Sequence, residues 1–414
     1  MRKRLEFQAD RIEAVLALHK VPARVTGGTV TPRWVRFQVL PAVGTKISKI
    51  KGLSEELAAA LDASNCRVSR RGAAVAVEVP RDDPQPVRLL PLFRQLDDGD
   101  GSMPPVTAIL GLAEDGAPLL IRLPSPDVAH ILVAGTTGSG KTMLLQTMIL
   151  SLAMANPAPS PFQREGRAGG LTLMLIDPKG AAFGLFEGLP HLARPVIRDV
   201  EETTEALNSL VHLMERRGSS PPASGFAVSA YAGRSPELVE GRSRRAGPNG
   251  GAGGGSHPRV VVVIDELADL LMVGGKPVQW ALTRLTQRGR EAGIHIVAAT
   301  QKPTTAVLGP LVKANFPVRL VGRVTSVEDA RTATGWSGTG AERLMGRGDF
   351  LAVAEGRVIR FQAAYVSPEE IEEMVIHLAQ GEILSASPSL ASATRRISLP
   401  WPVNRLTEAF GGGT

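Results

Sequence analysis

Five short apolar runs recur along the middle of the chain, each bounded by polar or turn-forming residues. They are HILVAG, LTLMLID, RVVVVIDE, GIHIVAAT and VRLVGRV, at residues 130–135, 171–177, 259–266, 293–300 and 318–324. Their apolar residues are nearly continuous, which is typical of strands covered on both faces of a parallel sheet. Helical stretches separate the runs. The pattern therefore predicts an α/β fold with a mainly parallel sheet over residues 105–378.

Residues 1–104 show a different pattern of strands and helices. In WVRFQVL the apolar Val35, Phe37 and Val39 fall on one side of a strand, and AAVAVEVP predicts a second strand that a proline terminates. SEELAAALDA is typical of a helix with Ser54 as its N-cap. We interpret RDDPQPVRLLPLF as a proline-rich connector. We therefore expect a small α+β domain before the core domain.

Two segments of biased composition interrupt or end this organisation. Residues 218–257 are rich in Gly, Ser, Pro and Arg, and we expect a flexible insertion within the core domain. Beyond the helix predicted for PEEIEEMVIHLAQ, the chain ends in a glycine-rich stretch. We expect residues 379–414 to form a largely disordered tail.

Composition adds information about partners and location. The chain has 414 residues, of which 43% are hydrophobic, as is usual for globular proteins. A net charge of +7 suits a polyanionic partner, but a generic basic protein would have the same charge, and charge alone does not distinguish the two. Cys66 is the only cysteine, so no internal disulfide can form, and this suits a reducing, cytoplasmic location. No apolar run reaches membrane-spanning length, and the first residues lack the apolar centre of a signal peptide.

The segment after the first apolar run fits a phosphate-binding loop that opens a helix. In AGTTGSGKT, Gly135 is followed by four residues and then by Gly140, Lys141 and Thr142, which is the full G-x-x-x-x-G-K-[ST] pattern. Glycines let backbone N–H groups approach an anion, Lys141 would reach the β- and γ-phosphates, and Thr142 would hold Mg²⁺. The predicted ATP-binding residues are Gly135, Thr136, Thr137, Gly138, Ser139, Gly140, Lys141 and Thr142.

A pair of acids at the end of the third apolar run restricts the kind of nucleotide-dependent enzyme that the sequence can encode. Asp265 ends the strand predicted for RVVVVIDE, where a carboxylate can hold Mg²⁺ through water, and Glu266 follows it. A second carboxylate at this place suits a general base that orients or deprotonates the attacking water. The pair favours an ATPase over a P-loop GTPase, and the sequence contains no guanine-reading motif.

Further polar residues flank the fourth run. Gln301 follows the strand predicted for GIHIVAAT, where its side chain can contact the γ-phosphate or the attacking water. Before this strand, LTRLTQRGREAGIH carries Arg284, Arg288 and Arg290. A guanidinium from this segment can reach the γ-phosphate of a neighbouring subunit. The residues alone do not distinguish among the three arginines.

Taken together, these blocks resemble the motor region of the FtsK/SpoIIIE family of DNA translocases. The blocks are, in order, HILVAGTTGSGKT, LMLIDPKG with FEGLPHLARPVIRD, ALNSLVHLMERR, VVVVIDELADLLM, GREAGIHIVAATQKP, LVKANFPVR and GRGDFL. The stretch TPRWVRFQVLPAVGTKISKIKGLSEELAAAL also resembles the small α domain that precedes this motor. The likeness extends over about residues 10–378.

The resemblance implies a RecA-like P-loop ATPase that forms a homohexameric ring around double-stranded DNA, with ATP bound between subunits. By position in the family motifs, Arg290 is the arginine that acts in trans. Lys302, Lys313 and Arg331 match basic residues that face DNA in the channel. Such contacts go to phosphates, so binding would be sensitive to salt and largely independent of DNA sequence.

The sequence departs from the family pattern in several ways. The N-terminal membrane region, the long linker and the C-terminal winged-helix domain that are usual in the family are not expected here. Val327 stands where a further basic residue is common, and the role of Asp177 and Lys179 in IDPKG stays open. Two alternatives to a DNA translocase also stay open: a related pump for conjugative DNA or a secreted protein, and a nucleotide-gated DNA-binding scaffold with little turnover.

Overall fold

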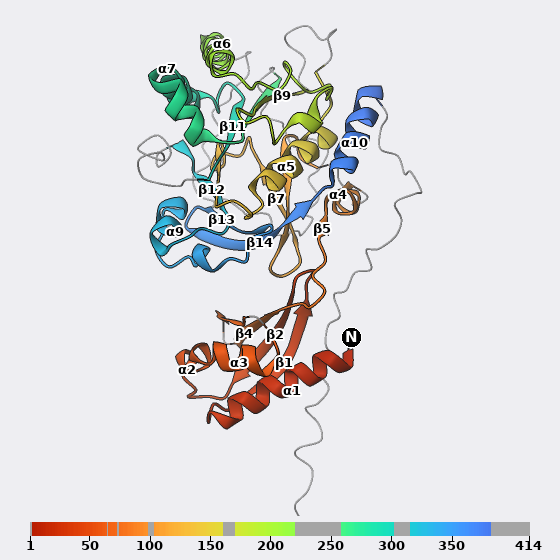
Figure 1. Cartoon of the computed structure of the whole chain (residues 1–414), viewed down its shortest axis with the longest axis vertical. Coiled ribbons are helices and arrows are strands. Elements are labelled where there is room, and N and C mark those ends of the chain that lie inside the picture. Colours follow the sequence, from red (N-terminus) through yellow and green to blue (C-terminus); the bar gives the residue numbers. More distant parts are fainter. Residues whose placement is uncertain are drawn as a thin grey trace, which may run out of the picture. The chain divides into compact units, whose positions relative to one another are not determined.

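The chain forms two compact units that divide after Pro86 (Figure 1). The structure is a computed structural model, and it describes residues 2–63, 65–72, 74–97, 103–159, 170–219, 258–301 and 315–381.

Unit 1 is a four-stranded antiparallel sheet with three helices. Its elements are α1 (Arg2–Leu18), β1 (Ala23–Val30), β2 (Trp34–Pro41), α2 (Ile47–Gly52), α3 (Ser54–Ala60), β3 (Arg67–Arg71) and β4 (Ala74–Pro80). The strands lie in the order β1-β2-β4-β3. Val35, Phe37 and Val39 all enter the core that the helices cover, as their alternation predicts.

Two details of this unit differ from expectation. Ser54 is the first residue of α3 rather than its N-cap; Leu53 holds the cap position, with no side-chain hydrogen bond to the helix. The division between units lies after Pro86 rather than near residue 104. The reason is that β5 (Val87–Arg88) pairs with β14, and α4 (Leu89–Asp97) buries its leucines in the core of unit 2.

Unit 2 is built on a ten-stranded sheet. Its remaining strands are β6 (Thr107–Ala113), β7 (Pro118–Arg122), β8 (Ile131–Ala134), β9 (Leu171–Ile176), β10 (Arg259–Ile264), β11 (Ile294–Thr300), β12 (Val318–Val321), β13 (Asp349–Ala354) and β14 (Arg357–Tyr365). Its helices are α5 (Lys141–Ala155), α6 (Val200–Ser219), α7 (Leu267–Arg288), α9 (Val327–Thr334) and α10 (Pro368–Gln380), with single turns η1 (Gly184–Phe186) and η2 (Ala341–Arg343).

The five predicted strands form the parallel centre of this sheet. They lie in the order β12-β8-β11-β10-β9, and every neighbouring pair among them is parallel. The α/β prediction is thus confirmed. Four further strands, β13, β14, β6 and β7, extend the sheet beyond β12 in antiparallel pairing. Parallel pairing puts the exits of β8, β10 and β11 at one edge of the sheet.

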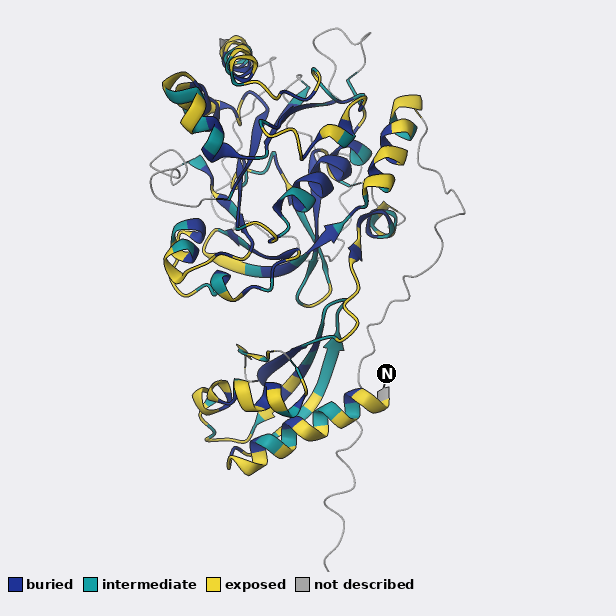
Figure 2. Ribbon diagram, viewed as in Figure 1, coloured by how far each residue is buried: buried dark blue, intermediate teal, exposed yellow. Residues whose placement is uncertain are grey.

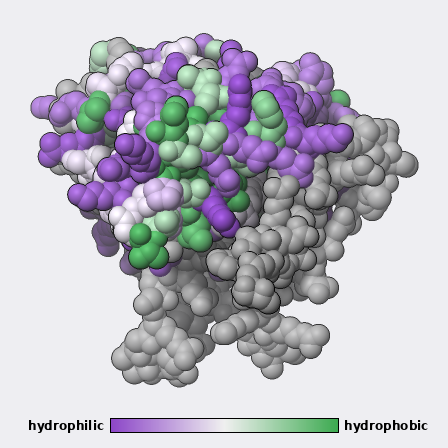
Figure 3. Space-filling model, turned by 90° about the horizontal axis from the view of Figure 1, so that it is seen from below, coloured by the Kyte–Doolittle hydropathy of each residue, from purple (hydrophilic) through white to green (hydrophobic). Residues whose placement is uncertain are grey.

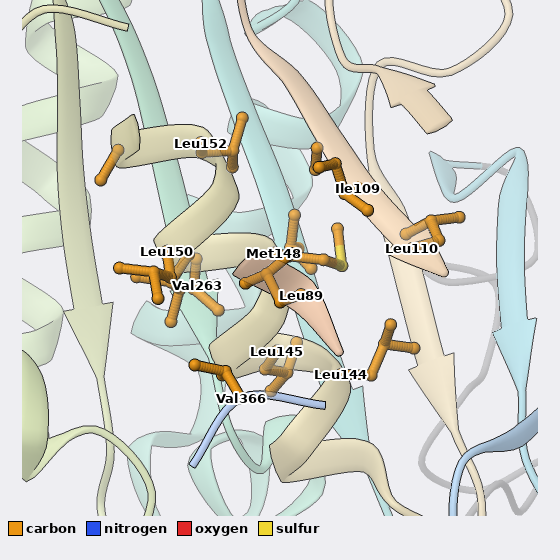
Figure 4. Packing of buried hydrophobic residues seen from close by; sticks show 14 of the residues in the cluster. Leu89, Ile109, Leu110, Leu144, Leu145, Met148, Leu150, Leu152, Val263 and Val366 are labelled. Atoms are coloured by element: carbon orange, nitrogen blue, oxygen red, sulfur yellow. The ribbon is translucent and has the colours of Figure 1, made fainter. Parts of the chain in front are cut away.

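Helices cover both faces of the parallel centre, which explains its continuous apolar runs. Leu132 packs on the face that α6 and α7 cover, whereas Ile131 and Val133 pack on the other face, with α4, α5 and α10. Helix α5 is buried on nearly all sides, and Leu144, Leu145 and the residues that follow pack against Leu89, Ile109 and Val263 (Figure 4). Burial is accordingly continuous through the central strands and one-sided on α6 and α10 (Figure 2).

The segments predicted to be insertion and tail are largely outside the described residues. Helix α6 runs through Ser219 and α10 through Gln380, so each extends slightly into the range that composition assigned to a loop or tail. Residues 220–257 and 382–414 lie outside the described part. Among the helices that the structure does describe, none is both long enough and apolar enough to cross a membrane.

Candidate active site

The phosphate-binding loop joins β8 to α5 with two glycines in a conformation that a side chain would not permit. Gly140 has φ +101, and a Cβ there would lie 2.7 Å from the backbone nitrogen of Gly348. Gly135 has φ +153, and its Cβ would lie 2.8 Å from Oγ of Ser139. A loop this tight is the shape that exposes successive N–H groups to an anion.

Lys141, the first residue of α5, is folded back over the loop. Its Nζ donates to the carbonyl oxygens of Gly135 at 2.7 Å and Thr136 at 3.1 Å. Burial lowers the pKa of Lys141 to about 8, although the negative charges of Glu266 and Asp265 oppose this shift. The ammonium is therefore held inside the loop, within range of both acids.

A second loop, just before β13, contacts the phosphate-binding loop through backbone hydrogen bonds. From the sequence alone this loop had no predicted role. The N–H groups of Arg347 and Gly348 donate to the carbonyls of Gly138 and Ser139 at 2.9 and 2.8 Å. This loop is held in turn by a buried ion pair in which Arg360 binds Asp349 at 2.7 Å. The closely spaced glycines of GRGDFL are the signal that could have indicated this role, because such a close backbone approach needs them.

The exit of β12, the strand next to β8, also fixes the phosphate-binding loop. Thr136 donates to the carbonyl of Arg323 through its N–H at 2.8 Å and its hydroxyl at 3.0 Å. A cluster that includes Ala134, Val324, Ala330 and Leu344 packs beneath this connection. The loop is therefore anchored to β8, to the exit of β12 and to the entry of β13.

The predicted acids come together at the exit of β10. Glu266 is 2% exposed and caps α7, and both of its carboxylate oxygens accept the backbone N–H of Gln301, at 3.2 and 3.1 Å. The side chain of Gln301 accepts from the hydroxyl of Thr137 at 3.1 Å. Glu266, Gln301 and the phosphate-binding loop thus form one connected group.

Asp265 lies in a cluster of negative charge. The pKa of Asp265 is raised to about 6, chiefly by burial and then by the neighbouring carboxylates of Asp177 and Glu266, while Lys141 and Lys179 oppose this shift. Crowded carboxylates of this kind are the oxygen ligands that Mg²⁺ prefers. With the hydroxyl of Thr142 on the first turn of α5, these residues fit Mg²⁺-bound ATP.

Asp177 and Lys179, whose role the sequence left open, both border the acidic cluster. Asp177 is fully buried at the exit of β9, and its Oδ2 accepts the N–H groups of Ala182 and Phe183 at 2.7 and 3.0 Å. Lys179 binds Asp269, in the first turn of α7, at 2.8 Å. The loop after β9 is thereby tied to the helix that Glu266 caps.

Arg290 lies at the other edge of the sheet from the phosphate-binding loop. It follows α7 and precedes β11, and its Nη1 donates to the carbonyl of Pro126, which precedes β8. These positions are at the amino ends of the parallel strands. Arg290 is therefore not part of the group formed by Lys141, Glu266 and Gln301 within one chain.

The predicted DNA contacts are only partly placed. Arg331 is exposed on α9, whose Ala330 and Ala333 pack toward the strand that leads into the phosphate-binding loop. Val327, in the first turn of the same helix, is 63% exposed. Lys302 and Lys313 lie outside the described residues.

Comparison with known proteins identifies similar chains. The model of the FtsK/SpoIIIE family matches residues 101–305, and that of the FtsK alpha domain matches residues 1–81. DNA translocase SpoIIIE of Bacillus subtilis is 33% identical over 383 residues, which is 91% of this chain and 46% of that protein. DNA translocase FtsK 2 of Ralstonia nicotianae is 36% identical over 393 residues, which is 91% of this chain and 48% of that protein. The chain thus spans about half the length of the curated relatives it matches.

A solved structure supports the fold alone. The conjugation coupling protein TcpA of pCW3, solved as a monomer with ATPγS, has a TM-score of 0.53 and is 19% identical, with 89% of this chain and 99% of that chain covered.

Proposed function

Because the chain belongs to the FtsK/SpoIIIE family, we propose that it is an ATPase that moves double-stranded DNA. The observation that carries the proposal is the connection of Glu266 through Gln301 to the phosphate-binding loop. This arrangement unites a site for the triphosphate with a carboxylate suited to activate water. The relatives named above are DNA translocases, which favours DNA as the substrate.

Binding of the nucleotide would rest on the residues of the loop. The N–H groups before α5 and the ammonium of Lys141 would hold the phosphates, and Thr142 and Asp265 would hold Mg²⁺, the latter through water. The metal would neutralise charge on the phosphates as it develops. Its positive charge would also relieve the repulsion that raises the pKa of Asp265.

Hydrolysis would depend on Glu266 as general base. The N–H of Gln301 fixes the plane of the carboxylate, and burial at 2% exposure keeps bulk water from solvating it. A fixed, water-poor carboxylate is suited to orient one water and accept its proton. The side chain of Gln301 bonds to the loop through Thr137, which places it to respond when the phosphate leaves.

The position of Arg290 favours a ring in which each site is completed by a neighbour. Within one chain this arginine lies at the edge of the sheet away from the loop, so only another copy could bring it to the triphosphate. We propose that Arg290 acts in trans in a homo-oligomer, a hexamer by analogy with the family. The proposed location is the cytoplasm, where both ATP and DNA are available.

DNA would be held in the ring by phosphate contacts from Arg331, Lys302 and Lys313. The test of the whole proposal is the ATPase rate measured with and without long duplex DNA. Stimulation by DNA supports translocation, whereas a rate indifferent to DNA indicates a pump for another cargo. The other alternative, a nucleotide-gated DNA-binding scaffold, predicts negligible phosphate release both with and without DNA.

A further inference from the structure

The net positive charge of the chain is concentrated in unit 1. Residues 1–86 contain fifteen lysines and arginines and nine aspartates and glutamates, a net charge of +6, whereas the whole chain has +7. The other residues hold 32 basic and 31 acidic side chains and are almost neutral. Unit 1 is therefore the strongly basic part of the protein, although the phosphate-binding site lies in unit 2.

Within unit 1 the basic residues gather at one end of the sheet. Residues 14–54 contain no acid and seven lysines and arginines, of which Arg33 and Arg36 lie toward the β1–β2 turn at the opposite end and the other five at this end. The strand pairing aligns Ala23 at the start of β1 with Pro41 at the end of β2, and Arg71 at the end of β3 with Ala74 at the start of β4. Because Val39 pairs with both Val25 and Val75, all of these strand ends lie together.

Six exposed cations occupy this end, which we call the basic end. Two belong to β1 or the residues before it, three to the segment of α2, and one to β3, against which α2 packs. None of the six forms an ion pair with any residue in the described part of the chain. The basic end consists of Lys20, Arg24, Lys46, Lys49, Lys51 and Arg70.

Some acidic residues of unit 1 lie near the basic end, where the carboxylate of Glu13 accepts the N–H of Val25 at 2.7 Å, and the others lie elsewhere. Asp82 and Asp83 follow β4 at the opposite end of the sheet and pair with Arg4 and Arg81. Glu78, which is 2% exposed in the middle of the sheet, pairs with Arg36 at 2.9 Å. The acids nearest to α2 in the chain are two exposed glutamates in the first turn of α3. The basic end therefore keeps a net positive charge that its own unit does not neutralise.

We propose that the basic end binds the phosphate backbone of duplex DNA, as a second contact besides that of the motor. The proposal rests on the proposed function for the presence of DNA, and the surface itself supplies the rest. Exposed lysine and arginine side chains bind phosphates by replacing condensed counterions, without reading bases. Two contacts in one chain make the second event intramolecular and so strengthen the whole attachment.

The scarcity of exposed apolar residues at this end disfavours insertion into a bilayer. Leu18 and Val43 are exposed here as well, at 80% and 108%, and single exposed apolar residues of this kind are common on soluble surfaces. In the view from below in Figure 3, hydrophilic side chains cover most of the coloured surface, with groups of hydrophobic side chains among them. Six cations against two separate apolar residues are better matched by a phosphate backbone than by a bilayer interior.

The test uses the full chain without nucleotide. In the triple variant Lys49→Gln, Lys51→Gln, Arg70→Gln, we expect weaker binding to a long duplex, measured by fluorescence anisotropy across about 50 to 200 mM salt. If all three contact phosphate, the slope of log affinity against log salt falls by about 2.7 for each bound chain. The independent pair Arg24→Gln, Lys46→Gln should lower it by about 1.8.

The control removes the same charge elsewhere, through Lys3→Gln, Lys276→Gln and Arg343→Gln, all exposed positions. If both test variants give the same slope of log affinity against log salt as the control variant, the proposal is overturned. This holds provided that the melting curves of the variants match that of the unsubstituted chain. Complete absence of duplex binding by the unsubstituted chain would also overturn this proposal, while the proposed function is tested separately by the ATPase rate with and without duplex DNA. Loss of binding to phosphatidylglycerol vesicles with unchanged DNA binding would overturn the proposal in favour of a membrane surface.

Discussion

The backbone N–H of Gln301 donates to both carboxylate oxygens of Glu266, at 3.2 and 3.1 Å. The two residues follow β11 and β10, which are adjacent parallel strands, so the bond joins two strand exits at the same edge of the sheet. The side chain of Gln301 extends the connection to Thr137 in the phosphate-binding loop, at the exit of β8. Three neighbouring exits are thereby linked around the place where a γ-phosphate would be cut.

The first prediction concerns the carboxylate in this link. We expect Glu266→Gln to lower the ATPase rate by about 10²- to 10⁴-fold, because an amide keeps the shape and the bond to Gln301 but cannot accept a proton. Nucleotide affinity, measured by fluorescence of a labelled ATP analogue, should stay within about two-fold of the unsubstituted value. The control is Glu291→Gln, an exposed acid next to Arg290. Phosphate release unchanged by Glu266→Gln would show that this carboxylate is not the base.

The second prediction concerns the fit of the loop against its support. We expect Gly140→Ala to abolish nucleotide binding, because the new Cβ would lie 2.7 Å from the backbone nitrogen of Gly348, which cannot move aside as a flexible side chain could. The positive φ of +101 adds about 1 to 2 kcal/mol of strain to the folded state. In the control Gly116→Ala, φ is also positive but no atom lies within 4 Å of the new Cβ. Nucleotide binding that survives equally in both variants would contradict this reading.

The site shows which parts of this protein could be predicted from local patterns. Asp265 and Glu266 stand directly after an apolar run, and Lys141 follows another run by one short loop. Parallel pairing of β8, β10 and β11 necessarily brings the exits of these runs to one edge. The nearly continuous apolar character of those runs was sufficient to predict the strands, because both faces of each strand are buried. The loop at Arg347 and Gly348 could not be found in this way, because its contact with the phosphate-binding loop is made by backbone atoms over about 200 residues of separation.

The boundary of unit 1 was missed for a related reason. Residues 81–93 look like a connector because three prolines interrupt them, yet their leucines are buried in the core of unit 2, and β5 pairs with β14. Long-range burial overrides local composition in such a segment. The prediction of Ser54 as an N-cap was wrong for a similar reason. Helix α2 ends at Gly52, and the next residue, Leu53, takes the N-cap position of α3.

The third prediction concerns acid stability. His130 and His295 are buried at the amino ends of β8 and β11, and burial lowers their pKa values to about 3 and about 4. The unfolded chain binds protons near pH 6.5 while the folded chain does not, so stability falls as the pH falls from 6.5 toward 4. Each histidine should contribute a loss of about 1.5 kcal/mol in the free energy of unfolding between pH 6.5 and pH 5.

Urea unfolding at these two pH values measures the loss. The variant His295→Gln should reduce the difference in the free energy of unfolding between pH 6.5 and pH 5, since it removes one group that is protonated only in the unfolded chain. His212→Gln, at a side chain that is 73% exposed, should leave the difference unchanged. An equal pH effect in both variants would mean that the buried pair does not set the acid sensitivity.

The fourth prediction tests whether Arg290 acts on a neighbour. Alone, Arg290→Ala and Glu266→Gln should each be nearly inactive while still binding nucleotide, because one lacks the guanidinium and the other the base. When the two proteins are mixed, a site that keeps Glu266 can face a partner that keeps Arg290. Random assembly makes about one interface in four complete, so ATPase activity should return to about a quarter. A mixture as inactive as its parts excludes action in trans, and Arg288→Ala then becomes the variant to examine.

The fifth prediction separates DNA contact from catalysis in the motor. Arg331 is exposed on α9, apart from the group of Glu266, Gln301 and Lys141, so Arg331→Ala should leave the ATPase rate without DNA unchanged. The concentration of duplex DNA that gives half-maximal stimulation should rise, and its dependence on salt should weaken by about 0.9 in log–log slope. Lys302→Ala with Lys313→Ala should have the same effect on stimulation by DNA and about twice the change in slope.

Arg343→Ala is the matched control, because this arginine is also exposed, in η2 close to α9. If Arg331→Ala instead lowered the rate without DNA, the side chain would be acting on the nucleotide site and not on the substrate polymer.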